Sequence, residues 1–312
     1  MRLLAVFYGL RPYKLACKVI SVGNITLGGT GKTPLVEYIA RLLKERGQKV
    51  AVLTRGYKGG RGDLSDEPLM LQNNLKGVPV IINPDRLAGA KEAMGDYGVN
   101  TVILDDGFQQ WWIKKDLEVA VIDSTNPFGN SHVLPRGILR EPLSSLRRAD
   151  IFVLTKTDLA ADTLALRDYL TRVNDSAVIV ESRHAPGCLY ALGDGDEMIE
   201  IQALKGKNAA LISGIGDPAS FEQTVKRLGI HIELSFRFND HHYYSQKDFD
   251  NIFTQCRQKN IVSVITTEKD AARLSGFPIK AQDIRVWVLG IKLVLTKNEE
   301  GFSNRLFGIY NP

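Results

Sequence analysis

The feature that most constrains the fold of this chain is a glycine-rich turn between an apolar, strand-like run and a helical repeat. The turn is Gly28-Gly29-Thr30-Gly31-Lys32-Thr33, the run before it covers residues 17–23, and the repeat after it stops at Gly47. Glycines let backbone N–H groups approach phosphate oxygens, and a helix N-terminus adds partial positive charge. The arrangement predicts a P-loop in which Lys32 reaches the β- and γ-phosphates of a nucleoside triphosphate and Thr33 ligates Mg²⁺.

One position departs from the strict P-loop pattern, which has glycine five residues before Gly31. This chain has Thr26 there, and Gly28 and Gly29 supply the flexibility instead. A chance glycine turn before a helix is the competing interpretation, and the strand before the turn and the Lys-Thr pair within it argue against that. The predicted nucleotide-binding residues are Thr26, Leu27, Gly28, Gly29, Thr30, Gly31, Lys32 and Thr33.

Short runs rich in Val, Ile and Leu recur along the first half of the chain and alternate with helical segments. They cover residues 49–54, 78–83, 100–105, 117–123 and 150–155. Continuous apolar strands joined through helices are typical of a parallel sheet with both faces covered. We therefore expect an α/β fold, with a P-loop NTPase-type parallel sheet domain over residues 1–183. A connector or hairpin at 184–200 is expected to lead into a second, smaller α/β domain within residues 184–312.

Two carboxylates, Asp105 and Asp106, end one of the predicted strands and precede Gly107. The carboxyl ends of parallel strands form the ligand-binding edge of an open α/β sheet. Adjacent buried carboxylates repel each other and lose solvation, and a divalent cation relieves both effects. We predict that both aspartates bind Mg²⁺ together with Thr33, the alternative being a solvated Asp-Gly turn.

The composition is that of an ordinary globular protein and narrows the possible partners. Of the 312 residues, 44% are hydrophobic and 24% are charged, and the net charge is +5. This modest charge, without a basic stripe rich in aromatics, predicts no nucleic-acid partner and argues against a nucleic-acid-binding ATPase.

The three cysteines lie far apart, which predicts neither a disulfide framework nor a cysteine-rich zinc site. The apolar start at residues 1–10 is too short to span a bilayer, and we expect it to pack on the domain or to act as a weak interfacial anchor.

A regulatory P-loop GTPase is an alternative that the residues alone leave open. Thr155-Lys156-Thr157-Asp158 follows a predicted strand and is similar to a guanine-specificity motif with Thr in place of Asn. The same string also fits a polar loop after a strand, and no switch segment with a water-positioning Gln stands out. Nucleotide preference would separate a GTPase from a kinase.

A series of short motifs between about Val19 and Leu274 stands in an order that is highly specific. The motifs are Ser21-Val22-Gly23-Asn24-Ile25-Thr26-Leu27-Gly28-Gly29-Thr30-Gly31-Lys32-Thr33-Pro34, Thr54-Arg55-Gly56-Tyr57, Asp66-Glu67-Pro68, Leu104-Asp105-Asp106-Gly107-Phe108-Gln109, Leu134-Pro135-Arg136-Gly137, Leu139-Arg140-Glu141-Pro142-Leu143, Arg147-Arg148-Ala149-Asp150, Phe238-Asn239-Asp240-His241 and Thr267-Glu268-Lys269-Asp270. This ordered set resembles the lipid A 4′-kinases, or tetraacyldisaccharide 4′-kinases.

The resemblance implies an ATP- and Mg²⁺-dependent kinase that phosphorylates the 4′-hydroxyl of a tetraacylated glucosamine disaccharide 1-phosphate, a lipid-linked substrate. It implies a location in the cytoplasm or, in peripheral contact with the membrane surface, at the cytoplasmic face of the inner membrane. The family's fold places the active site between a P-loop domain and a smaller C-terminal α/β domain. The resemblance leaves the oligomeric state open.

The family's Asp–His pair corresponds to Asp66 and His241, and a histidine oriented by a carboxylate would help a sugar hydroxyl attack the γ-phosphate. Arg140 would stabilise charge on that phosphate, and Glu141 would bind Mg²⁺ or position a ligand. The predicted catalytic residues are therefore Asp66, His241, Lys32, Arg140 and Glu141. The predicted metal ligands are Thr33, Asp105, Asp106 and Glu141.

Three departures from the family pattern are visible. Ser65 stands where the family has Gly before its Asp-Glu, and Gln110-Trp111-Trp112-Ile113 stands where it has His followed by basic residues. The two tryptophans would face acyl chains or pack on the sheet. About 18 residues precede the first predicted strand, so most of the family's N-terminal membrane helix is not expected.

Overall fold

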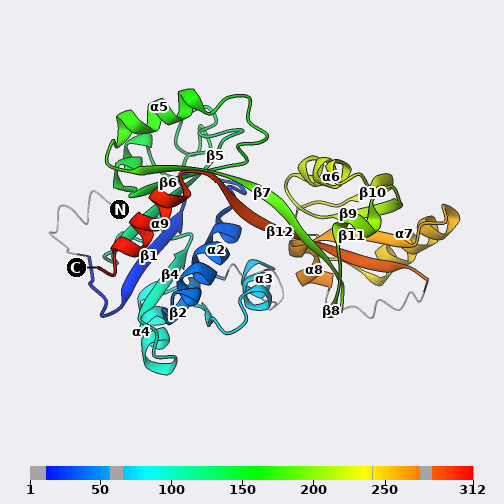
Figure 1. The fold of residues 1–312 in the computed structure, drawn as a ribbon, viewed down its shortest axis with the longest axis horizontal. Coiled ribbons are helices and arrows are strands. Elements are labelled where there is room, and N and C mark those ends of the chain that lie inside the picture. The colour runs from blue at the N-terminus through cyan, green and yellow to red at the C-terminus, as the bar shows by residue number, and fades with distance from the viewer. Residues whose placement is uncertain (1–11, 57–65, 241, 275–282, 312) are drawn as a thin grey trace. The chain divides into compact units, whose positions relative to one another are not determined.

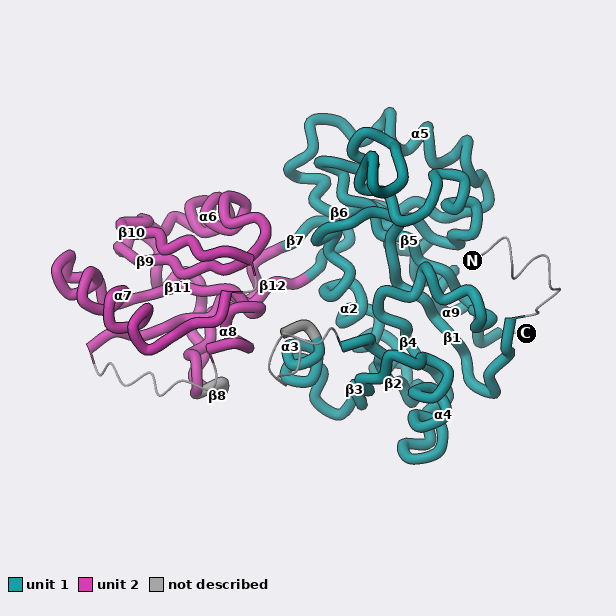
Figure 2. Tube along the Cα trace, turned by 180° about the vertical axis from the view of Figure 1, so that it is seen from behind, with its two compact units in different colours: residues 1–184, 293–312 teal, residues 185–292 magenta. Residues whose placement is uncertain are grey.

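The computed structural model describes residues 12–56, 66–240, 242–274 and 283–311, which form two compact units. Unit 1 comprises residues 1–184 and 293–312, and unit 2 comprises residues 185–292 (Figure 2). Two strands, β7 (Val178–Ala191) and β12 (Arg285–Lys297), carry the chain out of unit 1 and back into it. Unit 2 is therefore an insertion into the chain of unit 1.

Unit 1 is built on a parallel sheet in the strand order β7-β6-β5-β1-β4-β2-β3 (Figure 1). The remaining strands are β1 (Lys18–Gly23), β2 (Val50–Thr54), β3 (Val80–Ile82), β4 (Thr101–Asp105), β5 (Leu117–Asp123) and β6 (Ile151–Thr155). Every residue of β2, β4 and β6 is buried, as expected for strands covered on both faces. The predicted α/β class with a largely parallel sheet is confirmed.

Helices on both sides of this sheet bury two apolar faces. The helices are α2 (Lys32–Glu45), α3 (Asp66–Asn74), α4 (Arg86–Asp96), α5 (Leu164–Val173) and α9 (Glu299–Gly308), with a 3-10 turn at Leu143–Arg148. Alternate residues of β1 separate the two faces: Ile20 and Val22 pack with α2, whereas Val19 packs with α4. The P-loop helix is thus anchored by a core of its own on one face of the sheet.

The C-terminal segment belongs to unit 1, which corrects the expectation that all of residues 184–312 form the second domain. Leu293 and Leu295 of β12 and Phe302 and Leu306 of α9 are buried in the same apolar core as α2. Burying large apolar side chains of this kind stabilises each by roughly 1.5–3 kcal/mol. The local sequence does not indicate that the chain re-enters unit 1 after unit 2, because only tertiary packing determines which core the C-terminal segment joins.

We expect Phe302→Ala to lower the free energy of unfolding of unit 1 by about 3–5 kcal/mol, because it leaves a cavity around a side chain with 0% exposure. Chemical denaturation of the full chain would measure the loss. Phe307→Ala, on the same helix but only partly buried, should cost less. Equal losses for the two variants would contradict the packing described here.

Unit 2 is a second α/β arrangement, with its strands in the order β10-β9-β11-β12-β7 and β8 paired antiparallel with β7. Its further elements are β8 (Asp194–Ile199), β9 (Asn208–Ser213), β10 (His231–Arg237), β11 (Ser263–Thr267), α6 (Pro218–Arg227), α7 (Gln246–Gln258), α8 (Glu268–Leu274) and a 3-10 turn at Ile201–Leu204. Aromatic and aliphatic side chains of α7, among them Phe249 and Ile252, fill one face of this sheet, and Phe221 and Val225 of α6 fill the other.

Candidate active site

The P-loop lies between the end of β1 and the start of α2. Gly28 and Gly31 adopt left-handed backbone angles, with φ of 104° and 85°, a conformation that glycine adopts without a steric cost. Gly31 is the N-cap of α2, and no side chain caps that helix end. The first N–H groups of the helix have no partner within the helix itself, which is the usual basis of a phosphate site.

Lys32 points its ammonium group at two oxygen atoms close to the loop. Nζ donates to Asn24 Oδ1 at 3.2 Å and lies 3.4 Å from Asp106 Oδ1. Asn24 is buried and holds the loop itself, because its Nδ2 donates to the carbonyl oxygen of Thr26 at 2.9 Å. The lysine is therefore held on the β4 side of the P-loop by an amide and a carboxylate.

Asp106 follows β4 in a left-handed backbone conformation, with φ of 54°, and both of its oxygens meet Arg140. Arg140 Nη1 donates to Oδ2 at 2.7 Å and Nη2 donates to Oδ1 at 2.8 Å. Burial opposes ionisation of this carboxyl, but the hydrogen bonds from Arg140 and the charge of Lys32 outweigh it and lower the pKa of Asp106 to about 2. Asp106 is accordingly ionised at neutral pH.

Arg140 reaches this place because its segment pairs with the first half of the P-loop. The backbone N–H of Arg140 donates to the carbonyl of Ile25 at 2.6 Å, and that of Leu27 donates to the carbonyl of Ile138 at 2.8 Å. The guanidinium also donates to the Thr26 carbonyl at 3.1 Å and to the side chain of Asn24. The guanidinium is therefore fixed beside the phosphate loop although more than 100 residues separate the two segments.

Glu141, predicted as a catalytic residue and metal ligand, is buried in contacts with protein groups. Arg148 Nη1 donates to its Oε2 at 2.8 Å, and Gln109 Nε2 donates to its Oε1 at 3.1 Å. Burial opposes ionisation, but Arg148 outweighs it and lowers the pKa of Glu141. Gln109 Nε2 also donates to the Asn24 carbonyl at 3.0 Å, so Glu141 supports the start of the P-loop through Gln109.

The oxygen donors that could bind Mg²⁺ lie at the ends of β4 and the P-loop. Asp105 is buried, pairs with Val22 of β1 in the sheet and accepts a hydrogen bond from Thr54 Oγ1 at 3.3 Å. Mg²⁺ is usually held by one or two carboxylates, waters and substrate phosphates, and Thr33, Asp105 and Asp106 are oxygen donors of that kind. Within the described residues no group of three or more His, Cys, Asp or Glu side chains is placed to hold a metal ion.

The predicted acid–base pair is described only in part. Asp66 begins α3, and His241 lies outside the described residues. The neighbouring His242 stacks on Phe238 with ring centroids 4.4 Å apart, and its Nε2 lies 3.3 Å from Asp248 Oδ2. His242 is thus held in local packing within unit 2.

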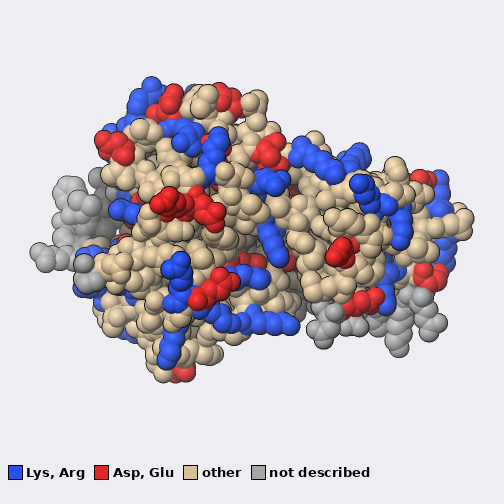
Figure 3. All heavy atoms as spheres, in the orientation of Figure 1, with Lys and Arg blue, Asp and Glu red and all other residues tan. Residues whose placement is uncertain are grey.

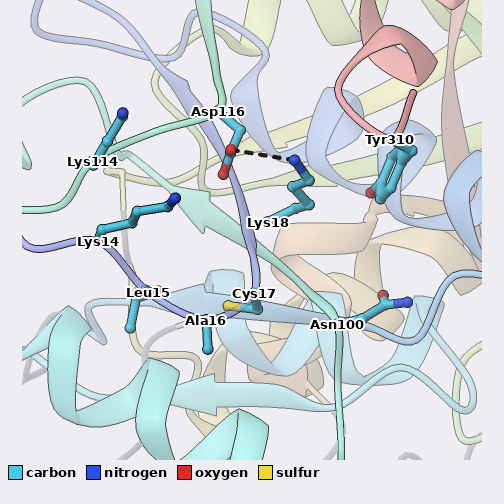
Figure 4. A pocket seen from close by; sticks show the side chains of 9 residues that line it. All are labelled: Lys14, Leu15, Ala16, Cys17, Lys18, Asn100, Lys114, Asp116 and Tyr310. Carbon is cyan, nitrogen blue, oxygen red and sulfur yellow. Dashed lines mark ion pairs between the residues drawn. The ribbon is translucent and has the colours of Figure 1, made fainter. Parts of the chain in front are cut away.

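A hollow of about 440 Å³ lies at the opposite edge of the unit 1 sheet, near the amino ends of the strands. Lys14, Lys114 and Lys18 line it, and Lys18 forms an ion pair of 3.6 Å with Asp116 (Figure 4). Elsewhere on the surface shown in Figure 3, acidic and basic side chains are interspersed. The hollow is separate from the P-loop because the two lie at opposite ends of β1.

These contacts define a P-loop nucleotide-binding protein: a phosphate loop, a lysine beside a strand-end aspartate, and an arginine fixed next to both. A sequence model described as tetraacyldisaccharide-1-P 4′-kinase matches residues 2–309. The chain belongs to this family.

Similar proteins cover nearly the whole chain. The tetraacyldisaccharide 4′-kinase of Halothermothrix orenii is 39% identical over an alignment of 317 positions, gaps included, which covers 92% of this chain and 82% of that protein. The one from Anaeromyxobacter dehalogenans strain 2CP-C is 38% identical over an alignment of 312 positions, gaps included, which covers 94% of this chain and 82% of that protein. The crystal structure of "apo" LpxK from Aquifex aeolicus in complex with ATP has a TM-score of 0.79 and 30% identity, and the match covers 99% of this chain and 94% of that one.

The family membership confirms the resemblance drawn from the ordered motifs and the kinase activity, and it favours a kinase over the regulatory GTPase. No helix among the described residues is long and apolar enough to cross a membrane. Asn24, Gln109 and Arg148 are site residues that the sequence analysis did not assign. Their roles rest on contacts between distant segments, which a single sequence does not reveal.

Proposed function

We propose that this chain transfers the γ-phosphate of ATP to the 4′-hydroxyl of a tetraacylated glucosamine disaccharide 1-phosphate. The observation that carries the proposal is the arrangement of Lys32, Asp106 and Arg140 beside the P-loop. Two fixed cations next to an uncapped helix end suit a transferring phosphoryl group, whose negative charge grows at its oxygens. Family membership supports the lipid acceptor.

Each residue of the site has a proposed role. Lys32 and the P-loop N–H groups bind the β- and γ-phosphates, and Arg140 stabilises charge on the transferring group. Thr33, Asp105 and Asp106 would hold Mg²⁺, which when bound neutralises phosphate charge. The Glu141 side chain is held by Arg148 and Gln109 and is only 5% exposed, whereas that of Asp106 is 23% exposed. We therefore assign Glu141 to positioning the P-loop start rather than to the metal.

Transfer of labelled γ-phosphate from ATP to the tetraacyl disaccharide 1-phosphate tests the proposed function. We expect the product to carry label at the 4′ position and GTP to be a poorer donor. A matched acceptor without a free 4′-hydroxyl should remain unlabelled. Selective GTP binding with slow hydrolysis and no transfer to the lipid would refute the kinase and favour the GTPase.

Asp66 and His241 are proposed to activate the acceptor hydroxyl. His241→Ala is expected to lower the transfer rate on the order of 100-fold, the usual contribution of a general base. His242→Ala should lower it much less, because His242 is held by Phe238 and Asp248. Asp66→Asn should resemble His241→Ala, as measured in the same transfer assay. Equal losses for the two histidine variants would show that the assignment between them is wrong.

We propose that unit 1 contacts the membrane surface through an aromatic and basic patch formed by Tyr13, Lys14, Lys91, Trp112 and Lys114. Tyr13 and Trp112 are 48% and 46% exposed. Their segments lie side by side, because the backbone N–H of Tyr13 donates to the Trp112 carbonyl at 2.6 Å. Exposed Trp and Tyr favour the bilayer interface, and lysines favour anionic headgroups.

Flotation with phospholipid vesicles tests this patch. The full chain should bind vesicles containing phosphatidylglycerol more strongly than phosphatidylcholine vesicles, and a Tyr13→Ser/Trp112→Ser double variant should bind roughly tenfold less. Tyr97→Ser, at an exposed tyrosine that follows α4, serves as the matched control. Unchanged binding of the double variant would exclude the patch as the contact.

A further inference from the structure

His184 lies at the edge of the P-loop although no motif of the sequence points to it. β7 pairs in parallel with β6, with Val180 opposite Val153 and Glu181 opposite Leu154. Val180 packs in the core on the α2 face of the sheet. Because alternate residues of a strand share a face, His184 continues the series of Val180 and lies on the side of the P-loop helix, just beyond the end of β6.

The imidazole is packed directly on the glycine that caps α2. A Cβ atom added to Gly31 would lie 2.8 Å from His184 Nε2 and 3.3 Å from the methyl group of Thr155. Thr155 Oγ1 donates to the Thr30 carbonyl at 2.8 Å. The carboxyl end of β6 and the middle of β7 therefore contact the P-loop on the side away from β4.

The ring nitrogen that faces Gly31 has no hydrogen-bond partner among the described residues, and it is buried. An unsatisfied buried polar atom costs about 1–3 kcal/mol, and such atoms in native proteins call for a missing water, ion or ligand. Burial, followed by the charge of Lys156, lowers the pKa of His184. The ring is consequently neutral near pH 7, and a neutral imidazole carries one N–H donor.

The strand order indicates which end of the nucleotide would meet this nitrogen. Asp105 and Asp106, the proposed metal ligands next to the terminal phosphates, follow β4 on one side of β1. His184 lies within β7, Thr155 ends β6 and Lys156 follows it, and both strands are on the other side of β1. A nucleotide whose terminal phosphates lie toward β4 therefore has its ribose and α-phosphate toward His184.

We propose that His184 Nε2–H donates a hydrogen bond to an oxygen of the ribose–α-phosphate end of the bound nucleotide. This role rests on the proposed function, since it needs ATP in the P-loop. It also explains the close approach at residue 31, where any side chain would displace the ring. Lys156, which pairs with Asp123 at 2.7 Å, holds the adjoining loop after β6.

The test compares two variants of the full chain that fill the same space. His184→Leu removes the donor, and His184→Gln retains an N–H donor of similar reach. We expect the Leu variant to bind ADP about tenfold more weakly than the unsubstituted chain, with the Gln variant within about threefold. Pyrophosphate should bind equally to all three chains. His132→Leu, at a histidine elsewhere in unit 1 that contacts Asn130, is the control.

Isothermal titration calorimetry gives the affinities without requiring any lipid or phosphate transfer. The proposed hydrogen bond would be overturned if neither variant lost ADP affinity, or if the Leu and Gln variants lost it to the same extent. An equal loss of pyrophosphate affinity would overturn its placement at the nucleoside end. If the unsubstituted chain bound no adenine nucleotide, the proposed function would fail as well, and that result is distinct from the other two.

Discussion

Lys32→Ala should lower the rate of phosphate transfer on the order of 1,000-fold. The ammonium group is 3.4 Å from Asp106 and 3.2 Å from Asn24 in the structure, which keeps it extended beside the loop. A bound triphosphate would offer it oxygens with more negative charge than the amide. Removing it leaves the β- and γ-phosphates without their point charge, and the loss should be largest in the transition state.

The label-transfer assay at saturating ATP would measure this change in kcat. Lys44→Ala is the matched control, because Lys44 lies in the last turn of the same helix and its Nζ donates to the Lys76 carbonyl. That variant should keep the full rate. A Lys32→Ala chain with more than about a tenth of the normal kcat would contradict the assignment of residues 28–33 as the phosphate loop.

Arg140→Ala should lower the same rate on the order of 100- to 1,000-fold, and Arg140→Lys should recover little of it. The guanidinium makes two hydrogen bonds to Asp106, one to the Thr26 carbonyl and one to Asn24. A lysine ammonium is a compact donor that cannot span these oxygens. The substitution therefore removes both the charge beside the phosphates and the brace on the loop.

Arg147→Ala provides the comparison, since Arg147 is exposed and lies in the 3-10 turn that follows the same segment. Its transfer rate should be unchanged. Thermal unfolding of each variant would separate loss of catalysis from loss of the fold. A full transfer rate in the Arg140→Lys variant would show that a positive charge alone suffices. That result would contradict the requirement for a guanidinium that spans several oxygens.

The sequence was a good guide wherever one segment carried the whole signal. The runs at 49–54, 100–105 and 117–123 became β2, β4 and β5 within a residue or so, because continuous apolar stretches with turn residues at both ends describe buried parallel strands. The helix expected to start at Lys32 or Thr33 begins at Lys32. These elements are determined by residues that are neighbours in the sequence, so a single sequence is enough to predict them.

Features that depend on distant partners were not predictable. The hydrogen bond from Gln109 to Glu141 joins residues 32 positions apart, and the local sequence around Glu141 does not indicate it. α9 was assigned to the wrong unit because its amphipathic pattern does not say which core it enters. The packing of His184 on Gly31 arises only when β7 is aligned with β6.

The insertion of unit 2 into unit 1 also determines when unit 1 can be completed during synthesis. Phe302 and Leu306 complete the core beneath the P-loop helix, yet they leave the ribosome after the whole of residues 185–292. Until then, the core around α2 lacks these two side chains, and transiently exposed apolar surface of this kind favours association. A chain that ended at residue 292 would therefore present a P-loop unit that lacks its final helix, whether or not unit 2 had folded.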